Sequence, residues 1–99
     1  MHKAIIHTYS EEVLDALSHK DYNSFLRIIK AIEDLEESGV YSSNTKPLRN
    51  TDKIYRKRVG RWRVLFTIEK NIIDIWIIAI EKDTKKDYNK WIKYISTRY

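Results

Sequence analysis

The chain has 99 residues, of which 42% are hydrophobic and 33% are charged, and it has no cysteine. These values exclude two separate cores, a disordered tail, a disulfide framework and a cysteine-based metal site or nucleophile. The net charge of +5 is uneven: residues 1–54 carry 7 basic and 9 acidic side chains, whereas residues 55–99 carry 12 basic and 5 acidic ones. A basic half on a small domain favours a polyanionic partner.

No segment of the sequence suits a membrane. The apolar run at the N-terminus is too short for a signal peptide. The longest uninterrupted apolar run, residues 75–80, is far below the length of a membrane span. We therefore expect a cytoplasmic protein that forms one domain over residues 1–99 and has no membrane partner.

The first half of the chain predicts a strand and two helices. Residues 3–7 form a short apolar strand, and Ser10 is a suitable N-cap for a short helix that follows. Asp21 marks the start of a second helix, and Gly39 is a good C-terminal stop for it. The apolar residues of the second helix recur at helical spacing: Tyr22, Phe25, Leu26, Ile29, Ile32 and Leu35.

The second half predicts a loop, three antiparallel strands and a helix. Residues 40–52 lack periodicity and form a surface loop, and the strands span residues 53–59, 61–69 and 72–80. Lys70 and Asn71 suit a hairpin turn, and the last strand, apolar on both faces, suits a central position. Thr84 caps a final helix with one apolar face: Tyr88, Trp91, Ile92 and Ile95. The predicted class is α+β, with a helical hairpin packed on one face of a twisted sheet.

Arginines alternate along the two strands that meet at Gly60 and Arg61. A two-residue loop at this point places Arg58 opposite Arg63. Because side chains alternate between faces, Arg56 emerges on the same side as these two. The large apolar residues emerge on the other side: Tyr55, Val59, Trp62, Val64 and Phe66. Three guanidinium groups on one face repel each other unless an anion lies among them, and phosphate is the obvious candidate.

This stretch resembles the core motif of the RelE/ParE superfamily of bacterial and archaeal toxins. The motif is Tyr55-Arg56-Lys57-Arg58-Val59-Gly60-Arg61-Trp62-Arg63-Val64-Leu65-Phe66, and it is preceded by Lys46-Pro47-Leu48. The order of elements resembles that of the superfamily over nearly the whole chain. The resemblance implies a RelE-like fold, with an N-terminal strand and helical hairpin on a twisted antiparallel sheet and a C-terminal helix.

The resemblance implies two alternative activities. RelE-type members are endoribonucleases that cut mRNA on the ribosome without a metal or other cofactor. ParE-type members share the fold but inhibit DNA gyrase, and a member of either type can have lost its activity. Both types are neutralised by a small, usually acidic antitoxin protein. The expected partners are therefore mRNA on the ribosome and a cognate antitoxin, with gyrase as the alternative target.

The resemblance also implies roles for individual residues. The expected catalytic residues are Arg56, Arg58, Arg63 and Tyr88. The expected RNA-binding residues are Arg61, Lys82, Lys85 and Lys86. Arginine suits phosphate because its planar fork binds two oxygens and stays charged. Asp83 stands near a position where family members often carry an arginine, which keeps the gyrase alternative open.

Structural roles compete with some of these assignments. The strand arginines could be held by carboxylates from a neighbouring segment instead of by phosphate. Tyr88 fits the core-facing stripe of the last helix as well as it fits a catalytic role. Trp76 and Trp91 are candidate antitoxin contacts, provided that they are exposed in the free protein.

Overall fold

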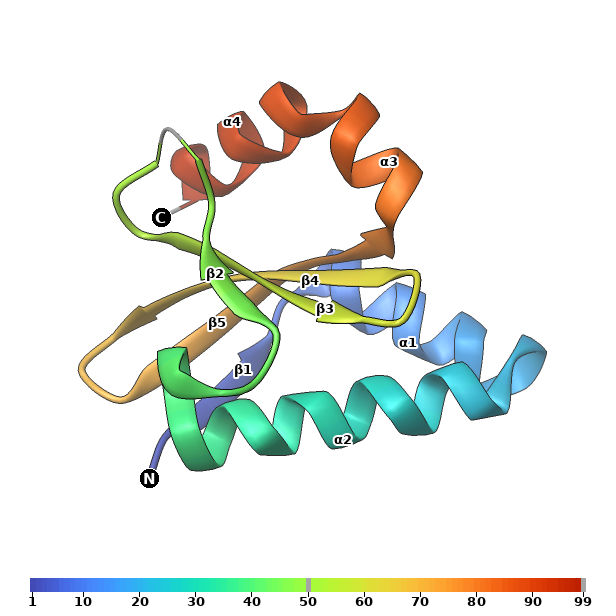
Figure 1. The fold of residues 1–99 in the computed structure, drawn as a ribbon. Helices are drawn as coiled ribbons and strands as arrows, with labels where there is room; N and C mark the ends of the chain where they lie inside the picture. The colour runs from blue at the N-terminus through green and yellow to red at the C-terminus, as the bar shows by residue number, and fades with distance from the viewer. Residues whose placement is uncertain (50, 99) are drawn as a thin grey trace.

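A computed structural model describes residues 1–49 and 51–98 of the chain. The elements are arranged around one sheet (Figure 1). The first half of the chain forms β1 (Lys3–Ile6), α1 (Thr8–Lys20), α2 (Tyr22–Ser38), the 3-10 turn η1 (Gly39–Tyr41) and β2 (Thr45–Pro47). The second half forms β3 (Ile54–Val59), β4 (Trp62–Glu69), β5 (Ile72–Ile80), α3 (Glu81–Lys86) and α4 (Tyr88–Arg98). None of the helices in this part of the chain is long and apolar enough to cross a membrane.

The sheet has the strand order β1-β5-β4-β3-β2. β1 pairs with β5 in parallel, and the other neighbours are antiparallel. β5 is therefore a central strand, as its two apolar faces predicted. The β4–β5 turn also forms as predicted, because Lys70 and Asn71 adopt positive φ values of 49° and 67°, which a tight two-residue hairpin loop requires.

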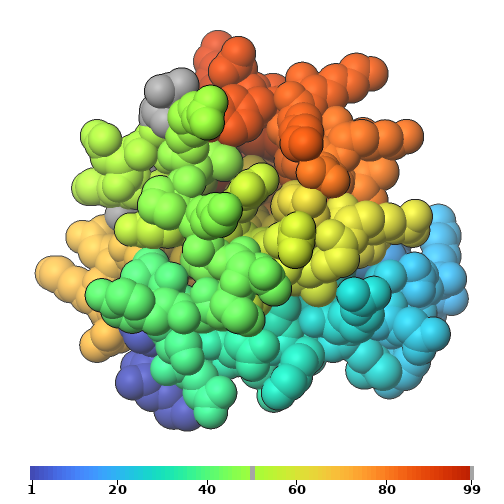
Figure 2. Space-filling view, viewed as in Figure 1, coloured from blue at the N-terminus to red at the C-terminus, as the bar shows by residue number. Residues whose placement is uncertain are grey.

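The helices lie in two layers, one on each side of the sheet. α1 and α2 cover one face, which confirms the predicted helical hairpin, and α3 and α4 lie over the other face (Figure 1). The space-filling view shows a hollow between the segment around β2, in green, and the helices α3 and α4, in orange (Figure 2).

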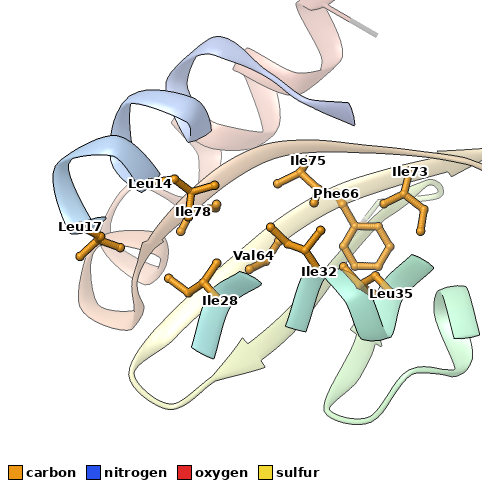
Figure 3. Packing of buried hydrophobic residues seen from close by; sticks show 10 residues of the cluster. All are labelled: Leu14, Leu17, Ile28, Ile32, Leu35, Val64, Phe66, Ile73, Ile75 and Ile78. Atoms are coloured by element: carbon orange, nitrogen blue, oxygen red, sulfur yellow. The ribbon is translucent and has the colours of Figure 1, made fainter. Parts of the chain in front are cut away.

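Each face of the sheet has its own buried cluster. The cluster under α1 and α2 (Figure 3) consists of Leu14, Leu17, Ile28, Ile32, Leu35, Val64, Phe66, Ile73, Ile75 and Ile78. The cluster under α4 consists of Leu48, Ile54, Leu65, Trp76, Ile77, Ala79, Trp91 and Ile95. Burial of apolar side chains on both faces is the main force that holds the helices against the sheet.

The boundaries of α2 follow the predicted signals. Asp21 caps its N-terminus, and the Asp21 carboxylate accepts hydrogen bonds from the backbone N–H of Ser24 at 3.2 Å and from the Ser24 hydroxyl at 2.7 Å. The hydroxyl bond is the main reason that the pKa of Asp21 is lowered. Gly39 ends the helix with a φ of 56°, and a Cβ there would lie 2.8 Å from Cε1 of His2. The positive φ favours glycine at this position, and a larger residue would also displace the end of the His2 side chain.

Three sequence predictions about element boundaries are wrong. α1 begins at Thr8 because Glu11 N–H already donates to the carbonyl of His7, the actual N-cap, so Ser10 lies inside the helix and is buried. The predicted loop contains β2. The last helical segment begins directly after β5 at Glu81, and its break at Asp87 separates α3 from α4, so Thr84 lies within α3 instead of capping the final helix.

Lys57 is a buried cation on the α2 side of the sheet. Its residue is only 3% exposed, and its Nζ donates to Ser42 Oγ at 2.5 Å and to the carbonyl of Ser43 at 2.6 Å. Burial lowers the pKa of Lys57, and the Asp34 carboxylate partly opposes that effect. Because these bonds join β3 to the segment before β2, Lys57 holds the edge of the sheet in place.

We expect Lys57→Met to lower the free energy of unfolding by about 1–3 kcal/mol, because the polar atoms of Ser42 and Ser43 lose their buried donor. Because the pKa of Lys57 is lower in the folded state, there is a pH interval between that pKa and the ordinary lysine pKa. In this interval the unfolded state binds more protons than the folded state. Wild-type stability should therefore rise with pH in that interval relative to the variant. Urea unfolding from pH 7 to pH 10 measures both effects. Lys30→Met, at an exposed site on α2, is the control, and parallel pH curves for wild type and Lys57→Met would contradict the assignment.

Candidate nucleic-acid interface

The register of β3 and β4 places three arginines on one face of the sheet. Arg58 pairs directly with Arg63, and Arg56 pairs with Leu65. Gly60 has a φ of 60° in the two-residue loop between the strands. The predicted hairpin is thus confirmed. The apolar residues of the two strands pack on the opposite face against α1 and α2, as expected: Tyr55, Val59, Trp62, Val64 and Phe66.

Arg56 lies at the centre of three adjoining hollows that we call the basic cleft. The largest has a volume of about 530 Å³ and is lined by Lys46, Pro47, Leu48, Arg49, Arg56, Lys85 and Tyr88. A smaller one continues beneath α3, and a third leads along β3 to Arg58. Among the residues that the structure describes, no carboxylate lines any of the three hollows, so the cleft concentrates positive charge.

Arg56 and Arg58 differ sharply from Arg63 in their surroundings. Within residues 1–49 and 51–98, Arg56 forms no ion pair and is half-buried, and Arg58 forms none and is exposed. Arg63 is only 5% exposed: its Nη1 donates to the carbonyls of Gly60 and Trp62, both at 2.9 Å, and its Nη2 lies 3.0 Å from Oε1 of Glu81. The alternative of an arginine held by a neighbouring carboxylate is therefore realised for Arg63.

Tyr88 contributes to the core and to the cleft at once. Its ring packs against the cluster under α4, and its hydroxyl donates a hydrogen bond to the carbonyl of Arg49 at the wall of the cleft. This bond joins the start of α4 to the segment that follows β2. The two interpretations of Tyr88 are thus compatible, because one part of the side chain stabilises the fold while the hydroxyl faces the cleft.

Solved structures of other proteins share the arrangement of this chain. The YoeB–YefM complex from Staphylococcus aureus matches with a TM-score of 0.69 at 14% identity, over 82% of this chain and 98% of that one. The archaeal RelE–RelB complex from Pyrococcus horikoshii OT3 matches with a TM-score of 0.67 at 21% identity, over 80% of this chain and 93% of that one. The YoeB/ParE toxin from Agrobacterium tumefaciens matches with a TM-score of 0.69 at 11% identity, over 80% and 98%. This chain has the RelE/ParE toxin fold.

The likeness to RelE/ParE toxins is one of fold, and the predicted resemblance is confirmed at that level. No protein-family model and no curated protein matches the sequence. The basic cleft therefore has to be judged on its own residues.

The expected RNA-binding residues divide into two groups on this RelE/ParE fold. Lys85 lines the basic cleft, and its Nζ lies 3.0 Å from Oε1 of Glu81. The other three are not among the residues that line the cleft: Arg61, Lys82 and Lys86. Arg61 lies in the turn after β3, and Lys82 and Lys86 are exposed on α3.

Sequence reasoning missed three charged residues of this region. Lys46 and Arg49 line the cleft, and Glu81 bridges Arg63 and Lys85. Lys46 was noted in the Lys-Pro-Leu segment, but only β2 pairing, which sets Lys46 opposite Arg56, brings it to the site. Glu81 carried no distinguishing signal apart from its place directly after the apolar strand.

A second hollow of about 400 Å³ lies on the opposite face, between α2 and β3. Its lining includes the cations Arg27 and Lys30, but also the Asp34 carboxylate, which lies 3.8 Å from Nζ of Lys30. We assign anion binding to the basic cleft because no carboxylate of the described residues lines it, whereas Asp34 lines the second hollow. Trp76 and Trp91 are both buried, which removes them as candidate antitoxin contacts.

Proposed function

We propose that this protein is the toxin of a toxin–antitoxin module and that it cleaves mRNA on translating ribosomes in the cytoplasm, without a metal. One observation carries the proposal: Arg56 lies without an ion pair, among the described residues, at the centre of a cleft lined by further cations and by no carboxylate. A phosphodiester bound there would gain charge-assisted hydrogen bonds from arginine. The RelE/ParE fold supports the same conclusion.

The cleavage step requires charge stabilisation and two proton transfers. The ribose 2′ oxygen forms a bond to the adjacent phosphorus, and the bond from phosphorus to the 5′ oxygen breaks, leaving a cyclic phosphate and a free 5′-hydroxyl. Arg56 and Arg58 would stabilise the negative charge that builds up on the phosphate oxygens. The 2′-hydroxyl must lose a proton and the 5′ oxygen must gain one. Tyr88 and Lys85 are the protic side chains at the cleft that we assign to these transfers.

We propose an acidic antitoxin segment as the protein partner. The solved YoeB–YefM and RelE–RelB structures are complexes of a toxin with its antitoxin. In this chain the basic cleft offers Lys46, Arg49 and Arg56 to such a segment. Antitoxin carboxylates bound in the cleft would prevent RNA from entering it and would neutralise the repulsion between these cations.

Primer extension on a defined mRNA in a translating extract tests the nuclease function. We expect new 5′ ends at codons occupied by ribosomes, and none when translation is blocked before elongation. The purified wild-type protein should first be shown to be folded by circular dichroism. A folded protein that produces no cuts at any concentration would refute the nuclease function.

A gyrase inhibitor is the second candidate. The observation that favours it is that no histidine or carboxylate of residues 1–49 and 51–98 lines the basic cleft, which leaves proton transfer to Tyr88 and the lysines. The Tyr88 hydroxyl is also engaged by the Arg49 carbonyl. Inhibition of supercoiling in vitro, without mRNA cuts in the extract, would support this candidate. Unchanged supercoiling at saturating protein would exclude it.

A further inference from the structure

A single carboxylate oxygen holds two cations beside the basic cleft. Oε1 of Glu81 lies 3.0 Å from Nη2 of Arg63 and 3.0 Å from Nζ of Lys85. The side chain of Arg63 is 6% exposed, whereas those of Glu81 and Lys85 are 40% and 71% exposed. The carboxylate thus lies at the boundary between a buried arginine and a lysine that lines the cleft.

The contacts of Glu81 are those that a phosphate would make. A non-bridging phosphate oxygen accepts hydrogen bonds from arginine and lysine in the same geometry as a carboxylate oxygen. Arg63 also has an unused donor, because its Nε is buried and has no hydrogen-bond partner among the described residues. The two bonds from Nη1 to backbone carbonyls hold the guanidinium in place independently of Glu81.

We propose that Glu81 is an internal competitor for the anion at Arg63 and Lys85, so that a bound RNA phosphate takes its place. The inference rests on the proposed RNA-binding role of the basic cleft. In the free protein, the Glu81 carboxylate neutralises the charge of Arg63 and occupies the position at which another anion would bind. When RNA occupies the cleft, the Glu81 side chain leaves, and Arg63 joins Arg56 and Arg58 as a phosphate ligand.

The local structure lets the Glu81 side chain move while its backbone stays. The backbone N–H of Glu81 donates to the carbonyl of Arg61 at 2.7 Å, and its carbonyl accepts from the hydroxyl of Thr84 at 2.8 Å. The Glu81 side chain is 40% exposed, so it can rotate toward water. The hydrogen bond from Lys85 and the charge of Arg63 lower the pKa of Glu81. The carboxylate is therefore ionised at neutral pH and is repelled by an incoming phosphate.

The test compares how tightly wild type and Glu81→Gln bind a fluorescein-labelled, ten-nucleotide 2′-O-methyl RNA. This probe cannot be cleaved because its 2′ oxygen is blocked. Fluorescence anisotropy should show that Glu81→Gln binds this probe about three- to tenfold more tightly than wild type. The slope of log affinity against log salt should be the same for both proteins, because displacement of Glu81 gives the wild-type complex the same phosphate contacts, whereas a slope steeper by about 0.7 in Glu81→Gln would mean that wild type lacks one of them. Glu33→Gln, on α2 at the other face of the sheet, makes the same change in net charge and should alter the affinity less than twofold.

Equal affinities for Glu81→Gln and Glu33→Gln, or weaker binding by Glu81→Gln, would overturn the inference. Glu81→Ala should behave as Glu81→Gln does, and thermal unfolding establishes that each variant is folded. A measurement on the unmodified protein covers the case in which both variants unfold. The ¹³C resonance of the Glu81 carboxylate should titrate at higher pH once the probe is bound, and an unchanged titration would refute displacement. This experiment measures RNA binding and not cleavage. A protein that binds the probe but does not cut mRNA in the extract would therefore contradict only the nuclease function.

Discussion

Arg56→Gln and Arg58→Gln should each reduce mRNA cleavage at least about 100-fold without changing the thermal stability of the protein. Each substitution removes a cation that faces the basic cleft and forms no ion pair among the described residues, so no carboxylate is left unpaired in the fold. Loss of a preorganised donor to the developing charge of a transition state costs about 10²–10³ in rate. The measurement is the initial rate of cutting in the translating extract, at equal concentrations of folded protein.

Arg61→Gln is the matched control for these two substitutions. It removes the same charge from the same hairpin, but Arg61 is exposed in the turn and is not among the residues that line the cleft. We expect a loss of only a few-fold. An equal loss in Arg61→Gln would show that overall charge, and not the cleft, carries the activity. Arg63 is unsuited to this test because its removal also leaves Glu81 without its buried partner.

Phe66→Ala should lower the free energy of unfolding by about 3–5 kcal/mol, the usual cost of removing a large side chain from a packed core. Phe66 is fully buried on β4 in the cluster under α1 and α2, where its ring packs near Leu35 and Ile32 (Figure 3). Its ring centroid lies 5.7 Å from that of Tyr55. Since small domains are stable by only about 5–15 kcal/mol, this one change removes a large share of the total.

Denaturant unfolding followed by circular dichroism measures this loss. The melting temperature should fall by at least about 12 °C, given the usual shift of about 4–8 °C per kcal/mol for a domain of this size. Phe25→Ala is the control, because Phe25 is only partly buried at the margin of the same cluster and should cost less. A loss below about 1 kcal/mol for Phe66→Ala would mean that the core under α2 can collapse around the cavity.

The strand hairpin and the central strand were predictable because their signals are local. Gly60 adopts the positive φ that the turn requires, and the alternation of charged and apolar residues then sets the register of Arg58 with Arg63. Asp21 and Gly39 set the ends of α2 by short-range bonds and backbone conformation. β2 could not be predicted, because a three-residue edge strand that ends in proline has no periodicity to read.

The sequence by itself determined the α+β class, the hairpin register and the common face of Arg56, Arg58 and Arg63, because these depend on alternation and turn chemistry between near neighbours. Only the tertiary structure decided which of the three is available to a ligand. Glu81 reaches Arg63 because β5 lies beside β4, and Lys46 joins the cleft because β2 pairs with β3. Such contacts depend on which strands become neighbours. The strand order is in turn set by the requirement that apolar side chains on both faces of the sheet become buried.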